Sequence, residues 1–266
     1  MNNFAIHCLL PGIRKKGDNK RLLSSRTVMG VMACVFFFLC QSSGSAVNKI
    51  SNLPFSDGET ITYDIKKLKM NVGQATIVYN GTVDLRGREV LLITVTAQGF
   101  RFFDEERIFL DPVTFHPYMI KRDLDIFGKK EKIVEIYHKQ HGEVMVIKAA
   151  NGKHSSQVIK QGERFDNIYG FIYRYRVQGQ FKAGEECSLH LPTRDVTFQL
   201  DEQKTLKVAG QEYHAYHMNS VPKKYKVWFE GGNKKIPLMI DGTIGFGRTS
   251  MVMKDYKDGD FKKISR

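Results

Sequence analysis

The stretch Leu91-Leu92-Ile93-Thr94-Val95-Thr96-Ala97 decides the fold, because apolar side chains recur at every second position. Successive side chains of a β-strand point to opposite faces, so Leu91, Ile93 and Val95 share one face with Ala97. Such alternation is typical of an antiparallel strand with one face on a core and the other in water. We therefore expect a chain built around strands of this kind.

The same alternation recurs along most of the chain. Its apolar positions are Ile61, Tyr63 and Ile65; Ala75, Ile77 and Tyr79; Val144 and Val146; Val196, Phe198 and Leu200; Tyr225, Val227 and Phe229; and Ile236, Leu238 and Ile240. Turn residues lie between these segments. Asn151-Gly152 is the pair that a two-residue hairpin prefers, because both of its positions need positive φ.

Residues 166–176 break the alternation and predict the one main helix. At the spacing i, i+3, i+4, i+7 of one helix face lie Ile168, Phe171, Ile172 and Tyr175. We expect Asp166 to cap the helix by accepting hydrogen bonds from free amides, and Arg174 and Arg176 to lie near its carbonyl end. An aromatic helix in a sheet-rich chain is expected to pack into the concave side of the sheet.

These patterns predict an all-β fold, rich in strands with one main helix, arranged as a curved antiparallel sheet or a barrel. No solenoid repeat, low-complexity linker or composition break divides residues 50–258. Single all-β domains often reach about 200 to 250 residues. We expect one β-rich domain over 47–258 and a charged tail over 259–266.

Residues 28–40 form an almost uninterrupted apolar run, which small and polar residues follow up to Ala46. A membrane-spanning helix needs roughly 20 apolar residues, so this run is short for one, and basic residues precede it. This order predicts a signal peptide over 1–46, cleaved between Ala46 and Val47. The alternatives are an uncleaved signal anchor and a lipid-modified cysteine. The predicted location is the periplasm or the cell envelope.

The chain is basic, with a formal net charge of +13 at pH 7. Removing residues 1–46 takes away six Lys or Arg and one Asp, which leaves 35 basic and 27 acidic residues, or +8. Outside the cytoplasm, such a charge favours a lipid, lipopolysaccharide or anionic polysaccharide as partner, with peripheral association with the membrane. The sequence has no aromatic and basic RNA-binding motif, so nucleic acid is not an expected partner.

Residues 225–240 resemble the closing hairpin of a bacterial exported family catalogued as domain of unknown function 3108. The Val227-Trp228 strand, the glycine-rich turn and the Ile236-Pro237 strand follow one another as in that family. The resemblance continues upstream in Phe55, Gly58-Glu59, Tyr63, Gly73, Asp111-Pro112 and residues 166–176. It implies an exported, sheet-rich domain without an established activity, so no catalytic residue is carried over. A likeness to the curved sheets of lipoprotein carriers is an analogy.

Candidate catalytic and metal-binding residues are sparse. His214 and His217 are three residues apart, and on a strand such a pair points to opposite faces, so no metal site is expected. The acidic runs 104–106, 185–186 and 201–202 are expected in solvated loops rather than converging across a cleft. The sequence has no Gly-x-Ser-x-Gly nucleophile motif. We therefore expect no catalytic residue and no cofactor.

Aromatic residues provide the remaining candidate site. An apolar cavity inside a curved sheet is a usual form of lipid or small-molecule site, and its predicted lining is Phe102, Phe171, Tyr175 and Trp228. The functional hypothesis is non-enzymatic binding of an apolar or amphipathic envelope ligand or of a partner protein. The alternatives are an envelope hydrolase acting on polysaccharide or peptidoglycan, and an assembly protein with a filled core. A roomy apolar cavity favours the carrier, and a polar cleft with paired titratable groups favours the enzyme.

Overall fold

The computed structural model describes residues 53–138, 141–161, 164–243 and 248–259. The predicted signal peptide, its cleavage point at Ala46 and Val47, and the predicted tail beyond Gly259 lie outside these residues. All of the described residues lie within one compact unit, Ala46–Arg266.

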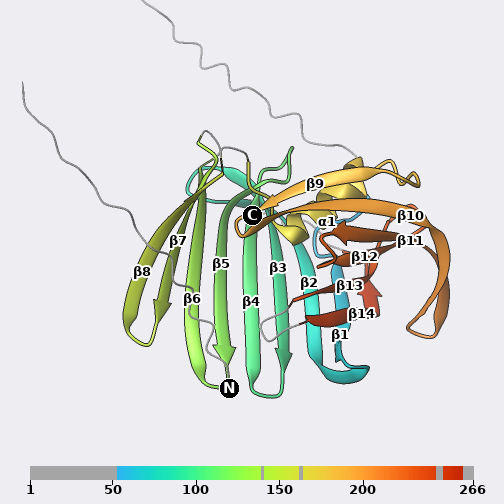
Figure 1. The fold of residues 1–266 in the computed structure, drawn as a ribbon, viewed down its shortest axis with the longest axis horizontal. Coiled ribbons are helices and arrows are strands. Elements are labelled where there is room, and N and C mark those ends of the chain that lie inside the picture. Colours follow the sequence, from blue (N-terminus) through green and yellow to red (C-terminus); the bar gives the residue numbers. More distant parts are fainter. Residues whose placement is uncertain (1–52, 139–140, 162–163, 244–247, 260–266) are drawn as a thin grey trace, which may run out of the picture. The chain divides into compact units, whose positions relative to one another are not determined.

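The described residues form strands and one helix (Figure 1). The elements, in chain order, are β1 (Thr60–Lys67), β2 (Met70–Asp84), β3 (Glu89–Gly99), β4 (Phe102–Leu110), β5 (Pro117–Ile126), β6 (Lys129–His138), β7 (Glu143–Ala150), β8 (Lys153–Lys160), α1 (Ile168–Gln178), β9 (Glu186–Leu191), β10 (Arg194–Val208), β11 (Gln211–Val221), β12 (Lys226–Glu230), β13 (Pro237–Thr243) and β14 (Arg248–Lys257). None of the described helical segments is long and apolar enough to cross a membrane.

The strands form one antiparallel sheet of 14 strands in the order β8-β7-β6-β5-β4-β3-β2-β1-β14-β13-β12-β11-β10-β9. The first strand therefore pairs with the last one, which joins the two halves of the chain at β1 and β14. The end strands β8 and β9 do not pair with each other, so the sheet is open. Figure 1 shows α1 on the inner side of the curled sheet. The predicted antiparallel sheet with one helix is confirmed, and the barrel does not close.

Alternate residues of the strands are buried, as the sequence predicts. Ile61, Tyr63 and Ile65 on β1 have no exposed surface, and the predicted apolar positions of β2 and β3 are buried beside them. Burying an aliphatic or aromatic side chain stabilises a fold by about 1.5 to 3 kcal/mol. One continuous core therefore follows the inner face of the sheet and includes residues of α1.

The predicted hairpin at Asn151-Gly152 is also confirmed. These two residues join β7 to β8 with φ angles of 51° and 71°. Both values lie in the left-handed region that Asn and Gly tolerate and that a type I′ turn requires. Arg86-Gly87, between β2 and β3, has positive φ at both positions in the same way.

The helix begins one residue later than predicted. Asn167, rather than Asp166, is the N-cap, and its side-chain oxygen accepts from the amides of Tyr169 and Gly170 at 2.9 and 3.1 Å. The carboxylate of Asp166 is already engaged, because Arg174 donates to it at 2.8 Å. The predicted role of Arg174 near the carbonyl end is therefore wrong. Its guanidinium turns back towards the start of the helix.

The helix is buried on more than its predicted face. Gly170 lies where α1 approaches β4, and a Cβ atom built there would be 3.0 Å from Leu110 Cδ2 and from the carbonyl oxygen of Phe115. A glycine in a helix interior costs about 1 kcal/mol relative to alanine. This close approach explains why the helix carries it.

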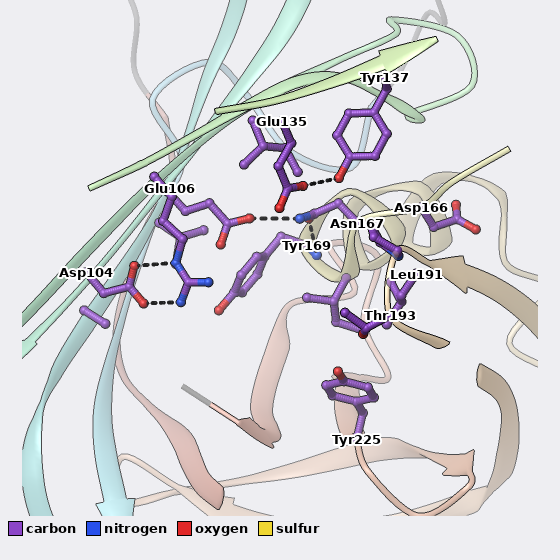
Figure 2. A pocket seen from close by; sticks show the side chains of 16 residues that line it. Asp104, Glu106, Glu135, Tyr137, Asp166, Asn167, Tyr169, Leu191, Thr193 and Tyr225 are labelled. Atoms are coloured by element: carbon purple, nitrogen blue, oxygen red, sulfur yellow. Dashed lines mark hydrogen bonds and ion pairs between the residues drawn. The ribbon is translucent and has the colours of Figure 1, made fainter. Parts of the chain in front are cut away.

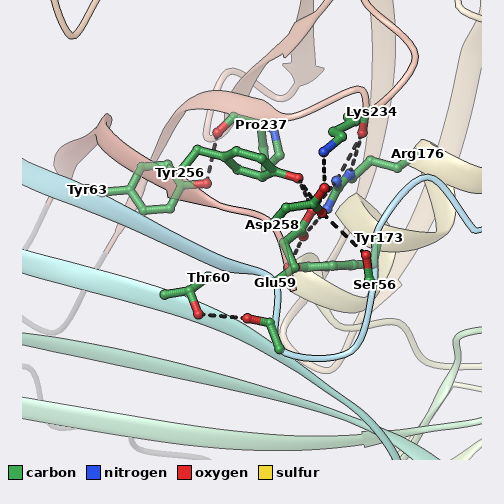
Figure 3. Close-up of polar contacts among 11 residues, drawn as sticks. Ser56, Glu59, Thr60, Tyr63, Tyr173, Arg176, Lys234, Pro237, Tyr256 and Asp258 are labelled. Atoms are coloured by element: carbon green, nitrogen blue, oxygen red, sulfur yellow. Dashed lines mark hydrogen bonds and ion pairs between the residues drawn. The ribbon is translucent and has the colours of Figure 1, made fainter. Parts of the chain in front are cut away.

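Arg176 lies in the last turn of α1, as predicted, and its side chain is sealed inside the domain (Figure 3). Arg176 donates to both oxygens of Glu59 at 2.7 Å, and neither side chain has exposed surface. Tyr173 and Tyr256 donate to the same carboxylate, at 3.1 and 3.2 Å. Arg176 also donates to the carbonyl oxygen of Lys234. This network joins α1, the segment before β1 and the turn before β13.

Candidate functional site

A cavity of about 250 Å³ lies between the inner face of β3–β6 and the start of α1 (Figure 2). Residues of the turn between β9 and β10 and Tyr225 form its remaining wall. The residues that line it are Val95, Ala97, Asp104, Glu106, Ile120, Arg122, Glu135, Tyr137, Asp166, Asn167, Ile168, Tyr169, Leu191, Pro192, Thr193 and Tyr225. The lining is amphipathic, because charged groups of the sheet meet aliphatic and aromatic side chains.

Strand register brings the charged groups together. Asp104 and Glu106 are two residues apart on β4, so their side chains share the inner face. Arg122 on β5 is directly opposite Glu106, and Glu135 on β6 is directly opposite Ile120 of β5. Three neighbouring strands therefore supply three carboxyl groups and one guanidinium to one cavity wall.

Asp104 and Arg122 form a bidentate pair. Arg122 Nε donates to Asp104 Oδ1 at 2.8 Å, and Nη2 donates to Oδ2 at 2.6 Å. The hydrogen bonds to Asp104 raise the pKa of Arg122, and the negative charges of Glu106 and Asp104 raise it further. Burial acts in the opposite direction but is outweighed. The Arg122 guanidinium is thus held in a fixed orientation at the cavity wall.

Glu106 has the most perturbed carboxyl group of the cavity. Burial raises its pKa from 4.5 to about 7, and the charges of Asp104 and Glu135 add to this effect. The Arg122 charge and a hydrogen bond from Asn167, whose Nδ2 donates to Oε1 at 2.9 Å, act in the opposite direction. At neutral pH this carboxyl group can therefore both donate and accept a hydrogen bond.

Glu135 and Tyr137 form the third polar element of the cavity. Both lie on the inner face of β6, and the Tyr137 hydroxyl donates to Glu135 Oε2. Burial raises the pKa of Tyr137, and the neighbouring charge of Glu135 raises it further. The phenol therefore remains protonated at physiological pH and continues to donate this bond.

Three of the four residues predicted to line an aromatic cavity, Phe102, Phe171 and Tyr175, lie in the core. Phe171 and Tyr175 are buried on α1, where Phe171 stacks on Phe198 with ring centroids 5.1 Å apart. Tyr175 packs against Phe229 at 5.5 Å. None of the four residues lines the cavity described above.

Phe102 and Trp228 lie apart from that helix pair. Phe102 is buried at the start of β4, and its ring covers Gly73 and Gly99 of the two preceding strands. Trp228 on β12 is half-buried and stacks on His217, with ring centroids 4.0 Å apart. The structure therefore brings Phe171 and Tyr175 together and places Phe102 and Trp228 elsewhere.

His214 and His217, the two histidines considered as metal ligands, differ in exposure. On β11, His214 is exposed and His217 is buried, where its Nδ1 lies 2.9 Å from Asp201 Oδ2. Burial lowers the pKa of His217, against the opposing charge of Asp201. Among the residues that the structure describes, no group of three or more His, Cys, Asp or Glu side chains is arranged to hold a metal ion.

The expectation of a solvated loop at residues 104–106 is wrong. These residues lie within β4, and Asp104 is buried. The alternation contained a signal for this placement, because Asp104 and Glu106 stand between Phe102 and Ile108 at steps of two, and both of these apolar residues are buried. The partners on β5, β6 and α1 had no comparable signal in the sequence.

Comparisons with known proteins give a fold likeness only. No family profile matches the chain, and no curated protein matches it. The resemblance to domain of unknown function 3108 therefore stays a prediction. A beta-barrel-like protein of domain of unknown function DUF1849 from Brucella abortus is similar with a TM-score of 0.47 and 11% identity, over 77% of this chain and 99% of that one.

Two further solved structures are similar over the same share of the chain. A protein with a YmcC-like fold from Bacteroides fragilis, described as exported, has a TM-score of 0.25 and 8% identity, over 77% of this chain and 98% of that one. A protein from Parabacteroides distasonis, described as a lipoprotein, has a TM-score of 0.28 and 8% identity, with coverage of 77% and 98%. Likenesses this low carry no argument about function.

Proposed function

We propose that the chain is an exported protein of the cell envelope whose β-rich domain binds the polar end of a small amphipathic ligand in the Glu106 cavity. Export is supported by the apolar run over 28–40 and the small residues that follow it. Binding is supported by a cavity in which a polar sheet surface meets aliphatic side chains. Of the apolar and amphipathic ligands expected from the sequence, the polar lining favours the amphipathic one.

The size of the cavity limits what enters it. Ligand sites commonly enclose about 300 to 1,000 Å³, and the cavity holds about 250 Å³. It therefore suits one sugar ring, an amine or a headgroup, and it is too small for the acyl chains of a lipid. Aliphatic parts of a larger ligand would have to remain against its mouth.

The charge of the cavity selects among polar groups. Four carboxyl groups line it, from Asp104, Glu106, Glu135 and Asp166, against the one guanidinium group of Arg122, which pairs with Asp104. An anionic group there would meet uncompensated negative charge. The ligand is therefore expected to carry hydroxyl or ammonium donors, and any anionic partner is expected at the basic outer surface.

The observation that favours binding over catalysis is the engagement of the three carboxyl groups that the sheet supplies to the cavity. Asp104 is held by Arg122, Glu106 by Asn167 and Glu135 by Tyr137. Each of them keeps further acceptor sites for a ligand. Such a fixed array is pre-organised for recognition.

Native mass spectrometry of the protein purified from its own envelope tests this proposal. Wild-type protein and the Glu105→Gln variant are expected to carry the same co-purifying mass, and Glu106→Gln is expected to lose it. Glu105 is the matched control because it lies on the same strand, and Arg107 pairs with it at 3.1 Å on the opposite face. A clean apo mass for gently extracted wild-type protein, or equal adducts in both variants, contradicts the proposal.

A second candidate function is hydrolysis of an envelope polysaccharide. Glu106, with a pKa of about 7, shares the cavity with Glu135, and a neutral acid beside a second carboxyl group is the basis of glycoside hydrolysis. Release of reducing ends from purified peptidoglycan tests it. The hydrolase requires activity in wild type and Glu105→Gln that Glu106→Gln lacks, and no release by wild type contradicts it.

A further inference from the structure

Four hairpin turns lie along one edge of the sheet. Because β1 to β8 are neighbours in chain order and antiparallel, the β1–β2, β3–β4, β5–β6 and β7–β8 turns all fall on the same edge. Figure 1 shows them along the lower side of the view. Each of these turns contains two residues, which are Leu68-Lys69, Phe100-Arg101, Phe127-Gly128 and Asn151-Gly152.

Three of these turns expose a large apolar side chain. Leu68 is 86% exposed, Phe100 is 82% exposed and Phe127 is 61% exposed. Met70, which directly follows the first turn, is 64% exposed. On the opposite edge of the same strands, the β2–β3 turn carries Arg86-Gly87. The β4–β5 turn, also on that edge, exposes Val113 by 38%. Among the described turns that join β1 to β8, the most exposed large apolar side chains therefore lie on one edge.

The backbone at these turns makes the apolar residues unfavourable for folding as well. Leu68 has φ of 49° and Phe127 has φ of 53°, in the left-handed region. That conformation costs roughly 1 to 2 kcal/mol for a residue with a bulky side chain. Asn151 occupies the equivalent position of the β7–β8 turn with φ of 51°. An asparagine therefore fits this turn position in the same sheet. Leu68 and Phe127 are less favourable for folding than asparagine would be, so fold stability does not explain their presence.

Positive charge accompanies the exposed apolar residues. Lys69 and Arg101 lie within the turns, and Lys129 and Lys130 follow Phe127; all four are exposed. The eight turn residues include no acidic side chain. Apolar tips flanked by Lys and Arg match an anionic bilayer, in which the tips enter the headgroup region and the cations meet lipid phosphates.

We propose that this edge is a membrane-docking surface that inserts Leu68, Phe100 and Phe127 into an anionic phospholipid bilayer. Strands lie about 4.8 Å apart, so the tips of successive hairpins stand about 10 Å from one another. Separate tips in a row do not form the contiguous apolar patch of a protein interface. A fluid lipid surface closes around each of them. The site is distinct from the Glu106 cavity, and its failure would leave the proposed ligand binding unaffected.

Flotation with lipid vesicles tests the proposal on full-length protein expressed with its own leader, in the form that cells accumulate. The test variant is the triple substitution Leu68→Asn, Phe100→Asn and Phe127→Asn. Asparagine tolerates the positive φ of the first and third turns, so this variant keeps its fold. The matched control is Val158→Asn, an exposed apolar residue on β8 that lies away from the tips. All proteins carry the same N-terminus, so differences between them report the substitutions.

Wild type and Val158→Asn are expected to float with vesicles of phosphatidylglycerol and phosphatidylethanolamine and to bind phosphatidylcholine vesicles weakly. The triple variant is expected to bind the anionic vesicles at least about tenfold less. Replacing Lys129 and Lys130 by Gln is expected to weaken binding about fivefold per charge. Vesicle binding that is unchanged in the triple variant overturns the proposal.

A fluorescent probe gives a direct readout of insertion. In Phe127→Trp, tryptophan emission is expected to shift to shorter wavelength when anionic vesicles are added, while the emission of wild type, which reports Trp228 alone, stays constant. An emission that vesicles leave unchanged in Phe127→Trp also overturns the proposal.

Discussion

Two arginine–carboxylate pairs organise the interior, and they differ in what surrounds them. Arg176 and Glu59 bind through two hydrogen bonds of 2.7 Å, and neither side chain has exposed surface. Arg122 and Asp104 bind through similar bonds of 2.8 and 2.6 Å, but Arg122 keeps 31% of its side-chain surface exposed. The same pairing chemistry is sealed in one place and open to a cavity in the other.

The difference lies in the groups around each pair. Two tyrosine hydroxyls and a backbone carbonyl complete the Glu59 network (Figure 3). The Asp104 pair instead stands beside Glu106, whose pKa is raised to about 7 by burial and by neighbouring carboxylates. A closed network stabilises the fold, and an open one with excess carboxyl groups is available to a ligand. Both places contain an ion pair. The Glu59–Arg176 network differs from the candidate site in that buried protein groups surround its carboxylate on all sides.

The largest loss of folding stability is expected when only one partner of the Arg176–Glu59 pair is removed. Arg176→Met leaves the Glu59 carboxylate buried without its guanidinium, and removing one partner of a buried pair costs about 3 to 5 kcal/mol. Urea unfolding followed by circular dichroism measures this loss. Glu59→Gln combined with Arg176→Met is the control, because removing both charges is expected to recover part of the stability. A double variant no more stable than the single one would contradict a role as an ion pair.

A smaller loss is expected from the open pair. Arg122→Met leaves Asp104 with access to cavity water, so the free energy of unfolding is expected to fall by about 1 to 3 kcal/mol. The same urea experiment measures it, with Arg107→Met on the outer face of β4 as a control near zero. If Arg122→Met were as destabilising as Arg176→Met, the two clusters would not differ in the way described here.

The carboxyl group of Glu106, beside the Asp104–Arg122 pair, is expected to make stability depend on pH. The pKa of Glu106 is raised from 4.5 to about 7 in the folded protein, so the folded state binds more protons than the unfolded state between these values. The contribution of Glu106 to stability is therefore expected to fall as pH rises from about 4.5 to 7, by about 1 to 2 kcal/mol after allowance for solvent at the cavity.

Glu106→Gln removes this dependence. Relative to wild type, its free energy of unfolding is expected to be higher at pH 8 than at pH 4, and urea titrations at the two pH values measure the change. Glu105→Gln serves as the control on the outer face. A difference between Glu106→Gln and wild type that is constant with pH would mean that Glu106 titrates normally.

The smallest change in stability is expected at the β5–β6 turn, which joins the strands that carry Arg122 and Glu135. Phe127→Asn places a residue that tolerates positive φ in the turn, and it is expected to raise the free energy of unfolding by up to about 1 kcal/mol, because asparagine removes part of the cost of the left-handed conformation. The substitution is expected to leave the pairing of β5 with β6 unchanged. Differential scanning calorimetry measures the shift, and a lower melting temperature would show that the Phe127 ring contributes to the fold.

Local periodicity explains which features were predictable. The alternation from Leu91 to Ala97 predicted a strand with one buried face, and Asn151-Gly152 predicted its hairpin, because both depend only on neighbouring residues. The helix was predicted from its spacing, but its cap was not. The choice between Asp166 and Asn167 depended on Arg174 reaching back to Asp166 at 2.8 Å.

The sequence alone determined a strand-rich chain with one aromatic helix and a basic net charge, since periodicity and composition are local properties. Only the tertiary structure decided which polar groups meet. Asn167 lies 61 residues from Glu106 in the chain, yet it donates to that carboxyl group at 2.9 Å. The pKa of Glu106 depends on burial and on charges from other strands. Strand order and register set these distances, and no short segment of the sequence contains them.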